Sequence, residues 1–132
     1  MHLEPYRSVD GLPFTVTPDE VRARCGPPER EGVNAVALHE LDYGHVVFRF
    51  QEGGRLEEVT KPGAVLHLGA VAVPFAALEG FIAVQDPQAF VRGGYVVSPR
   101  FGLAFVPAEP PWVTALAPHC IDTWRHLGPH TR

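Results

Sequence analysis

The 132-residue chain has only two cysteines, Cys25 and Cys120, and they match no CxxC spacing. A disulfide framework or a zinc knuckle is therefore excluded as the organising feature, and we expect both thiols to be buried. Long apolar runs are also lacking: the most apolar window, 64–82, is interrupted by a histidine, a proline, a glutamate and two glycines. Because a membrane-spanning helix needs about 20 apolar residues, no membrane segment is predicted.

The first residues, MHLEPYRSVDG, lack the basic start and the apolar run of a signal peptide, so we expect a cytoplasmic protein. Hydrophobic residues make up 45% of the chain and charged residues 20%, which is typical of a globular domain rather than a disordered segment. A chain of this length is large enough for one hydrophobic core. We therefore predict a single domain over residues 1–132.

The negative charge is concentrated in one segment, 29–58. Seven acidic residues lie there against three arginines, whereas the rest of the chain has eight residues of each sign. The acidic residues are Glu29, Glu31, Glu40, Asp42, Glu52, Glu57 and Glu58, and the arginines are Arg30, Arg49 and Arg55. Such a segment repels phosphates, so nucleic acid is disfavoured as a partner and a basic protein surface is favoured.

Helix signals come first along the chain. In TVTPDEVRARCGPP, Thr17 can cap a helix, Glu20 completes a capping box, and Gly26 with two prolines ends a helix of about two turns. Three strands are predicted between residues 35 and 60, joined by glycine turns into an antiparallel meander.

Strand alternation assigns the side chains of this meander to two faces. Val46, Phe48 and Phe50 are expected on one face and Arg49 on the other, solvated face. Arg49 can reach Glu57 or Glu58 across the turn. These two glutamates are sequence neighbours and point in opposite directions on a strand, so they cannot serve as an acid/base pair.

The pattern of the second half of the sequence predicts a helix over 74–86, strands in GYVVS and RFGLAFV, and a last amphipathic helix in APHCIDTWRHLG. Phe101, Leu103 and Phe105 are expected to face the core. Short-looped strands with helices at intervals indicate the α+β class: an antiparallel sheet of about five strands with helices packed on one face.

Histidines and cysteines are the candidates for chemistry. His119, Cys120, His126 and His130 gather near the C-terminus. On a helix, His119 and His126 would lie about 10 Å apart, and adjacent His119 and Cys120 would point in different directions, so we predict no metal site. Cys25 ends a helix, where the dipole raises the pKa of a thiol, and Cys120, the better nucleophile of the two, has no local partner. We predict no catalytic residue, no cofactor and no enzymatic activity.

Trp112 follows Pro110 and Pro111, in a segment that is not expected to pair as a central strand. A tryptophan held by a stiff loop is typical of an interface anchor, but Trp112 could equally fold back as a lid on the sheet edge.

The N-terminal run GLPFTVTPDEVRARCGPPER, followed by ALHELDYGHVVFRFQEGGRLEEVT, resembles a module of β-lactamase-inhibitor-protein-like domains. The same module occurs in small outer-membrane lipoproteins of the β-barrel assembly machinery. Thr17, Glu20, Val21, Gly26 and Pro28 carry the resemblance, which covers about 60 residues. The chain lacks the lipidation signal of the lipoproteins and the export signal and paired cysteines of the inhibitors. What the resemblance implies is a related fold and a binding role.

The whole chain is also similar in type to bacterial immunity proteins, which are small acidic cytoplasmic domains. We therefore expect an immunity protein that binds and occludes a cognate toxin with a basic surface, without binding nucleic acid or membranes. The predicted contact residues are Glu40, Asp42, Glu52, Glu57, Glu58 and Trp112. The alternative is a ligand-binding or enzymatic domain with a pocket between the sheet and helix 74–86, lined by His67, Tyr95 or Arg100. A homo-oligomer using the same aromatic edge is a third possibility, and the oligomeric state stays open.

Overall fold

A computed structural model describes residues 1–127 of the chain. Three helices were predicted, and all three form: α1 (Pro18–Cys25), α2 (Phe75–Gln85) and α3 (Cys120–Leu127). The predicted capping box of α1 is present. The Thr17 side chain accepts a hydrogen bond from the Glu20 N–H, and the Glu20 carboxylate accepts one from the Thr17 N–H. These reciprocal bonds satisfy backbone donors that the first helical turn leaves unpaired.

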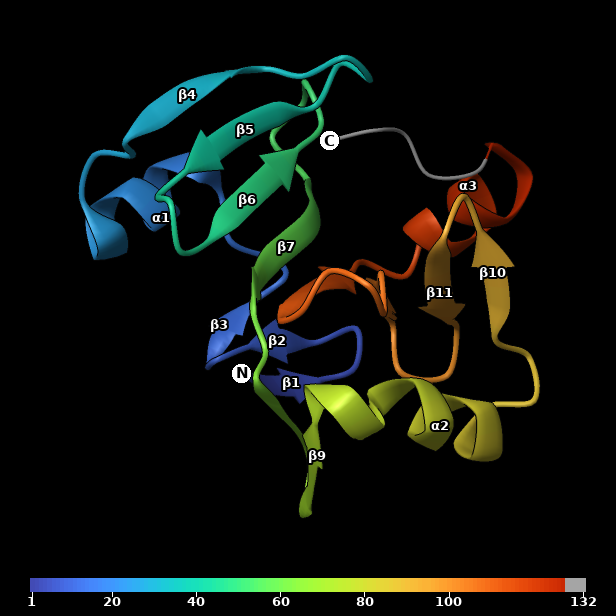
Figure 1. Cartoon of the computed structure of the whole chain (residues 1–132). Coiled ribbons are helices and arrows are strands. Elements are labelled where there is room, and N and C mark those ends of the chain that lie inside the picture. The colour runs from blue at the N-terminus through green and yellow to red at the C-terminus, as the bar shows by residue number, and fades with distance from the viewer. Residues whose placement is uncertain (128–132) are drawn as a thin grey trace.

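An antiparallel sheet of eight strands forms the centre of the molecule (Figure 1). Its strands are β4 (Arg30–Val33), β5 (His39–Asp42), β6 (Val47–Phe50), β7 (Leu56–Pro62), β10 (Phe90–Arg92), β11 (Tyr95–Ser98), β12 (Leu103–Phe105) and β13 (Trp112–Leu116). In space they follow the order β10-β11-β12-β13-β7-β6-β5-β4. The C-terminal strand β13 therefore lies between β12 and β7, and it joins the two predicted groups of strands into one sheet.

A second sheet has five short strands. These are β1 (His2–Glu4), β2 (Ser8–Val9), β3 (Leu12–Pro13), β8 (Val65–Leu68) and β9 (Val71–Pro74), in the spatial order β3-β2-β1-β8-β9. The pairing of β1 with β8 is parallel, whereas the other pairs are antiparallel. The N-terminal segment is thus anchored on residues more than 60 positions away, such as Leu68 opposite Leu3.

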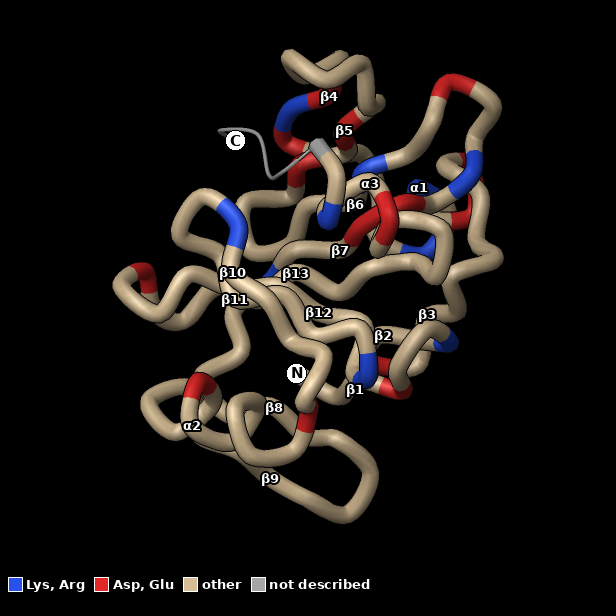
Figure 2. Tube along the Cα trace, turned by 90° about the vertical axis from the view of Figure 1, so that its right-hand side faces the viewer, with Lys and Arg blue, Asp and Glu red and all other residues tan. Residues whose placement is uncertain are grey.

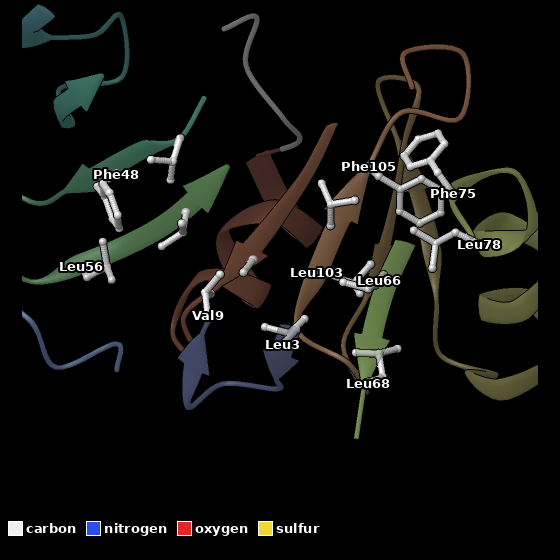
Figure 3. Packing of buried hydrophobic residues seen from close by; sticks show 14 of the residues in the cluster. Leu3, Val9, Phe48, Leu56, Leu66, Leu68, Phe75, Leu78, Leu103 and Phe105 are labelled. Carbon is white, nitrogen blue, oxygen red and sulfur yellow. The ribbon is translucent and has the colours of Figure 1, made fainter. Parts of the chain in front are cut away.

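The main core fills the space between one face of the large sheet, called the inner face here, and the small sheet with α1 and α2. Leu103 and Phe105 on the inner face meet Leu3, Leu66 and Phe75 (Figure 3). The rings of Phe75 and Phe105 lie edge to face with their centres 5.7 Å apart. This packing follows from strand alternation, because every second residue of β12 points to the same side.

The opposite, outer face of the large sheet is covered in part by α3. A smaller cluster of buried residues fills this contact: Val97, Ala104, Leu116, Ala117, Cys120, Ile121 and Trp124. The rings of Trp124 and Tyr95 lie 5.1 Å apart between helix and sheet. Helix α3 also reaches β7, because Trp124 Nε1 donates a hydrogen bond to Glu58 of that strand.

The predicted fold class, α+β with a single sheet of about five strands, is wrong. The chain is mostly β, with sheets of five and eight strands and three short helices within residues 1–127. Most of the strands that sequence reasoning missed have two to four residues each, which is too short for an alternating pattern to be recognised. The five-residue strand β13 was missed because two prolines directly precede it. Residues 35–38, predicted as the start of a strand, instead belong to the turn between β4 and β5.

Two burial predictions also need correction. Cys120 is buried as expected, but Cys25 is exposed, because α1 buries only Val21 against the core. Arg49 lies on the face predicted for it, yet only 5% of it is exposed. No described helix is long and apolar enough to cross a membrane.

Candidate functional site

Trp112 is the first residue of β13 and lies opposite Pro62 of β7. It therefore belongs to a central strand, against the prediction. The two prolines that lack N–H groups precede the strand, so they remove no hydrogen bond from its interior. The Trp112 side chain is 39% exposed, which places it between the two predicted extremes of a free anchor and a buried lid.

An open pocket of about 140 Å³ lies beside Trp112. Its lining comes from five strands and one loop. The strands supply Arg49 of β6, Thr60 of β7, Tyr95 of β11, Phe105 of β12, and Trp112 with Thr114 of β13, and the loop after β12 supplies Val106 and Glu109. Three aromatic residues line the pocket, Tyr95, Trp112 and the buried Phe105, together with the exposed Glu109. We call it the Trp112 pocket.

The floor of the Trp112 pocket is a row of hydrogen-bonded side chains on the outer face, which we call the Arg49 network. The Arg49 Nε donates to Glu40 Oε2 at 2.7 Å, and its Nη1 donates to Thr60 Oγ1 at 2.7 Å. The hydroxyls of Thr60 and Thr114 are 2.8 Å apart. Glu58 Oε1 lies 3.5 Å from the same guanidinium and Glu58 Oε2 accepts from Trp124 Nε1 at 3.2 Å.

The charge of this region is negative. Arg49 is the only cation that lines the pocket among the described residues, and Glu40 and Glu58 already neutralise it. Glu109 at the rim adds a further carboxylate. A buried guanidinium needs such partners because an unpaired buried charge is costly. The remaining negative charge, next to the faces of Trp112 and Tyr95, favours a cationic group over an anion.

A second cluster lies at the start of α3, and we call it the Glu57 cluster. The thiol of Cys120 donates to Glu57 Oε2 at 2.9 Å, and His119 Nε2 contacts the same carboxylate oxygen. The three ligand-type atoms lie within 4.8 Å of one another. His119 and Cys120 therefore converge, although the sequence predicted that they would diverge. His119 precedes the helix while Cys120 begins it, so helical geometry does not separate them.

Electrostatics keep the Cys120 thiol protonated. Burial raises its pKa well above the usual range, and the hydrogen bond to the Glu57 carboxylate raises it further. A thiol of this kind is a poor nucleophile, because the thiolate is the reactive form. The arrangement therefore gives no support to Cys120 as a nucleophile activated by His119.

The acidic residues predicted to contact a partner are scattered among different environments. Glu40 belongs to the Arg49 network, Asp42 pairs with Arg30 at 3.0 Å, and Glu52 is exposed in the turn between β6 and β7. Glu57 and Glu58 are each only 4% exposed. These two residues cannot contribute to a surface patch, because both side chains are directed at the α3 region.

The residues proposed for a ligand pocket near helix 74–86 do not converge. His67 stacks on the ring of His2 with centres 4.2 Å apart, and Arg100 lies over the ring of Phe101. Tyr95 lines the Trp112 pocket instead. The inward side of α2 is occupied by Leu78 and Ile82, which have no exposed surface.

Comparison with known proteins returns nothing. No family model, no curated protein and no solved structure matches the chain.

Sequence reasoning missed Thr60, Thr114 and Glu109, and it described Arg49 only as a solvated residue. Alternation along β6, β7 and β13 could have placed the first two with Arg49 on one face. The sequence did not indicate that β7 and β13 pair with each other, because Thr60 and Thr114 are 54 positions apart. His126 bonds to the Asp122 carbonyl at 2.9 Å, away from the Glu57 cluster, and His130 lies outside the described residues.

Proposed function

We propose that this protein is a protein-binding module, in its most concrete form a cytoplasmic immunity protein that occludes a cognate bacterial toxin. The observation that carries the proposal is the exposed Trp112 on a central strand beside an open, acidic pocket. A large aromatic side chain on a rigid strand loses little conformational entropy on binding, and tryptophan is enriched among residues that dominate interface energies.

The partner is expected to present a basic side chain to the Trp112 pocket. A lysine or arginine there would lie close to Glu109 and could stack on Trp112 or Tyr95. The volume of about 140 Å³ suits one side chain. It falls short of the roughly 300 Å³ or more that is usual for small-molecule sites, which makes ligand binding or catalysis the weaker alternative.

Charge placement supports a one-sided contact. Only one charged residue, Glu79, lies between Ala64 and Gln85, so the β8–β9 hairpin and α2 form a nearly uncharged end of the molecule (Figure 2). Acidic residues are found around β4 to β7 at the other end. A basic partner would therefore be steered away from the nearly uncharged end and toward acidic side chains such as Glu109 and those of the Arg49 network, which lie at the Trp112 pocket.

The test uses the protein encoded beside this chain as the candidate toxin, because toxin and immunity genes travel together. Purified chain and candidate are titrated against each other by calorimetry, with toxicity measured by co-expression. Trp112→Ala is expected to weaken binding about 30-fold or more, as for a dominant interface residue, and to abolish protection. Glu109→Gln should weaken it less and reduce its salt dependence.

Val84→Ala is the matched control, because Val84 is 79% exposed on α2, on the nearly uncharged end. This variant should bind like the wild type. Equal affinities for Trp112→Ala and the wild type, with unfolding curves that coincide, would remove Trp112 from the interface. Failure of the neighbouring gene product to bind at all would contradict the immunity function.

A further inference from the structure

We propose that the Glu57 cluster is a zinc-binding site, with Glu57, His119 and Cys120 as its three protein ligands. Carboxylate oxygen, imidazole nitrogen and thiolate sulfur are the three ligand types that zinc takes in proteins. Here they come from one strand and from the start of one helix, 62 positions apart in the sequence. The proposal is independent of the proposed toxin-binding function and of the Trp112 pocket.

The spacing of the three atoms fits a tetrahedral ion. With zinc bonds of about 2.0–2.3 Å, the ligand atoms of such an ion lie roughly 3.3–3.7 Å from one another. The ligand atoms of the cluster all lie within 4.8 Å, and Cys120 Sγ is 2.9 Å from Glu57 Oε2. Side-chain rotation that opens this pair by less than about 1 Å, and the closer contact of His119 Nε2 with the same oxygen by somewhat more, would admit the ion.

The backbone that carries the ligands is held firmly. Glu57 lies on β7, whose neighbours are β6 and β13, and its carbonyl oxygen accepts a hydrogen bond from Ala117 N–H at 2.9 Å. The carbonyl of Ala117 in turn accepts from Cys120 N–H at 3.0 Å. The segment before α3 is therefore fastened to β7, and zinc would bind to ligands that are already close together.

Burial and charge are consistent with an ion. The Glu57 side chain is almost fully buried, and its Oε1 accepts no hydrogen bond from the described residues. The only cation near that oxygen is Arg55 among the described residues, at 3.6 Å, on a side chain that is more than half exposed and can turn outward. A zinc ion would supply this buried carboxylate with a positive charge that does not depend on an exposed arginine.

Binding replaces the proton of the Cys120 thiol, which is released to solvent, so that thiolate, carboxylate and neutral imidazole surround the divalent ion. Like-charge repulsion between thiolate and carboxylate is then outweighed by the attraction of both to the metal. Among the ligands, His119 is the most open to solvent, with 30% of its side chain exposed. Zinc can enter past it, and a water molecule can take the fourth position.

The experiment titrates Zn²⁺ alone into the chelator-treated full chain in competition with a chromophoric chelator. One equivalent is expected to bind. Glu57→Gln, His119→Ala and Cys120→Ser should each weaken zinc binding by about 100-fold or more. Replacing a residue that only hydrogen-bonds to a metal ligand already lowers metal affinity by about 10- to 100-fold. The matched controls are Cys25→Ser and His126→Ala, which remove the other cysteine and a histidine of the same helix and should bind like the wild type.

Cobalt gives a second readout, because its absorption identifies the side chain that binds the metal. Co²⁺ bound by Cys120 is expected to show thiolate-to-metal charge-transfer absorption, which Cys25→Ser keeps and Cys120→Ser loses. His119→Ala is the decisive variant for zinc, because its partly exposed side chain can be removed without emptying the core. If folded His119→Ala bound Zn²⁺ like the wild type, or if the wild-type chain bound no stoichiometric zinc, the proposal would be overturned.

Discussion

On the inner face of the large sheet, β5, β6 and β7 present Leu41, Phe48 and Val59, whereas one residue away on the outer face the same strands present Glu40, Arg49 and Glu58. Except for Glu40, which is partly exposed, these side chains are buried. The inner face gains stability from removing apolar surface from water. On the outer face, the ion pairs and hydrogen bonds only offset the cost of burying charged and polar groups. They fix the orientation of these side chains more than they stabilise the fold.

Truncating a buried side chain should therefore cost more stability on the inner face than on the outer face. Leu103→Ala removes a side chain with no exposed surface from the core next to Leu3 and Leu66 (Figure 3). Lost burial and the cavity left behind should lower the free energy of unfolding by about 4 kcal/mol. Urea unfolding followed by circular dichroism measures this loss. Val84→Ala, on the exposed side of α2, should change stability by less than about 0.5 kcal/mol.

On the outer face the expected loss depends on whether one partner or two are removed. Arg49→Met leaves Glu40 and Glu58 without their guanidinium and should cost about 3 kcal/mol. Adding Glu58→Gln should recover part of that loss, because a neutral amide no longer needs the cation. A double-mutant cycle by urea unfolding measures the coupling. Purely additive losses would mean that the network is not electrostatically coupled.

The same comparison explains what could be predicted from the sequence. The helices carry local signals, such as the capping box at Thr17, and alternation identified Phe48, Phe50 and Arg49 with their correct faces. The Glu57 cluster and the pair Thr60 and Thr114 could not be found in this way. Their partners meet only because β13 pairs with β7, a long-range pairing for which no local pattern exists.

The small sheet was missed for a related reason. β2 and β3 have two residues each and β1 has three, so none of them shows a period of two. They are stabilised by packing on the inner face, where Leu3 and Val9 are buried, rather than by their own β propensity. Tertiary contacts therefore determine both this sheet and the outer-face sites, and the fold class was wrong because it counted only strands with local patterns.

A carboxylate at the end of α2 should make part of the stability pH-dependent. Burial alone would raise the pKa of Asp86, but the hydrogen bonds donated by Ser98 Oγ, the Arg100 N–H and the Gln88 N–H outweigh it and lower the pKa below 3.8. The stabilisation is therefore complete above about pH 4 and is lost as the pH falls through the lowered pKa.

Asp86→Asn is the variant that isolates this contribution. It should cost about 2 kcal/mol at pH 7, within the range for hydrogen bonds to a charged group. The difference in urea midpoint between the variant and the wild type should shrink as the pH falls below 3.8 and through the lowered pKa of Asp86, because the wild-type carboxylate then takes up a proton. A difference that stayed constant between pH 7 and pH 3 would show that the amide is a steric defect rather than the loss of a charged acceptor.

The smallest loss of stability is expected where a substitution on the outer face removes a hydrogen bond but leaves every buried charge with its partner. Thr114→Val keeps the shape of the side chain and its β propensity but removes the hydroxyl that lies 2.8 Å from Thr60 Oγ1. Thr60 still accepts a hydrogen bond from Arg49, so the change leaves no buried charge without its partner. The free energy of unfolding should fall by about 1 kcal/mol, measured by urea unfolding. A loss as large as that of Leu103→Ala would mean that the outer face stabilises the sheet as strongly as the inner face does.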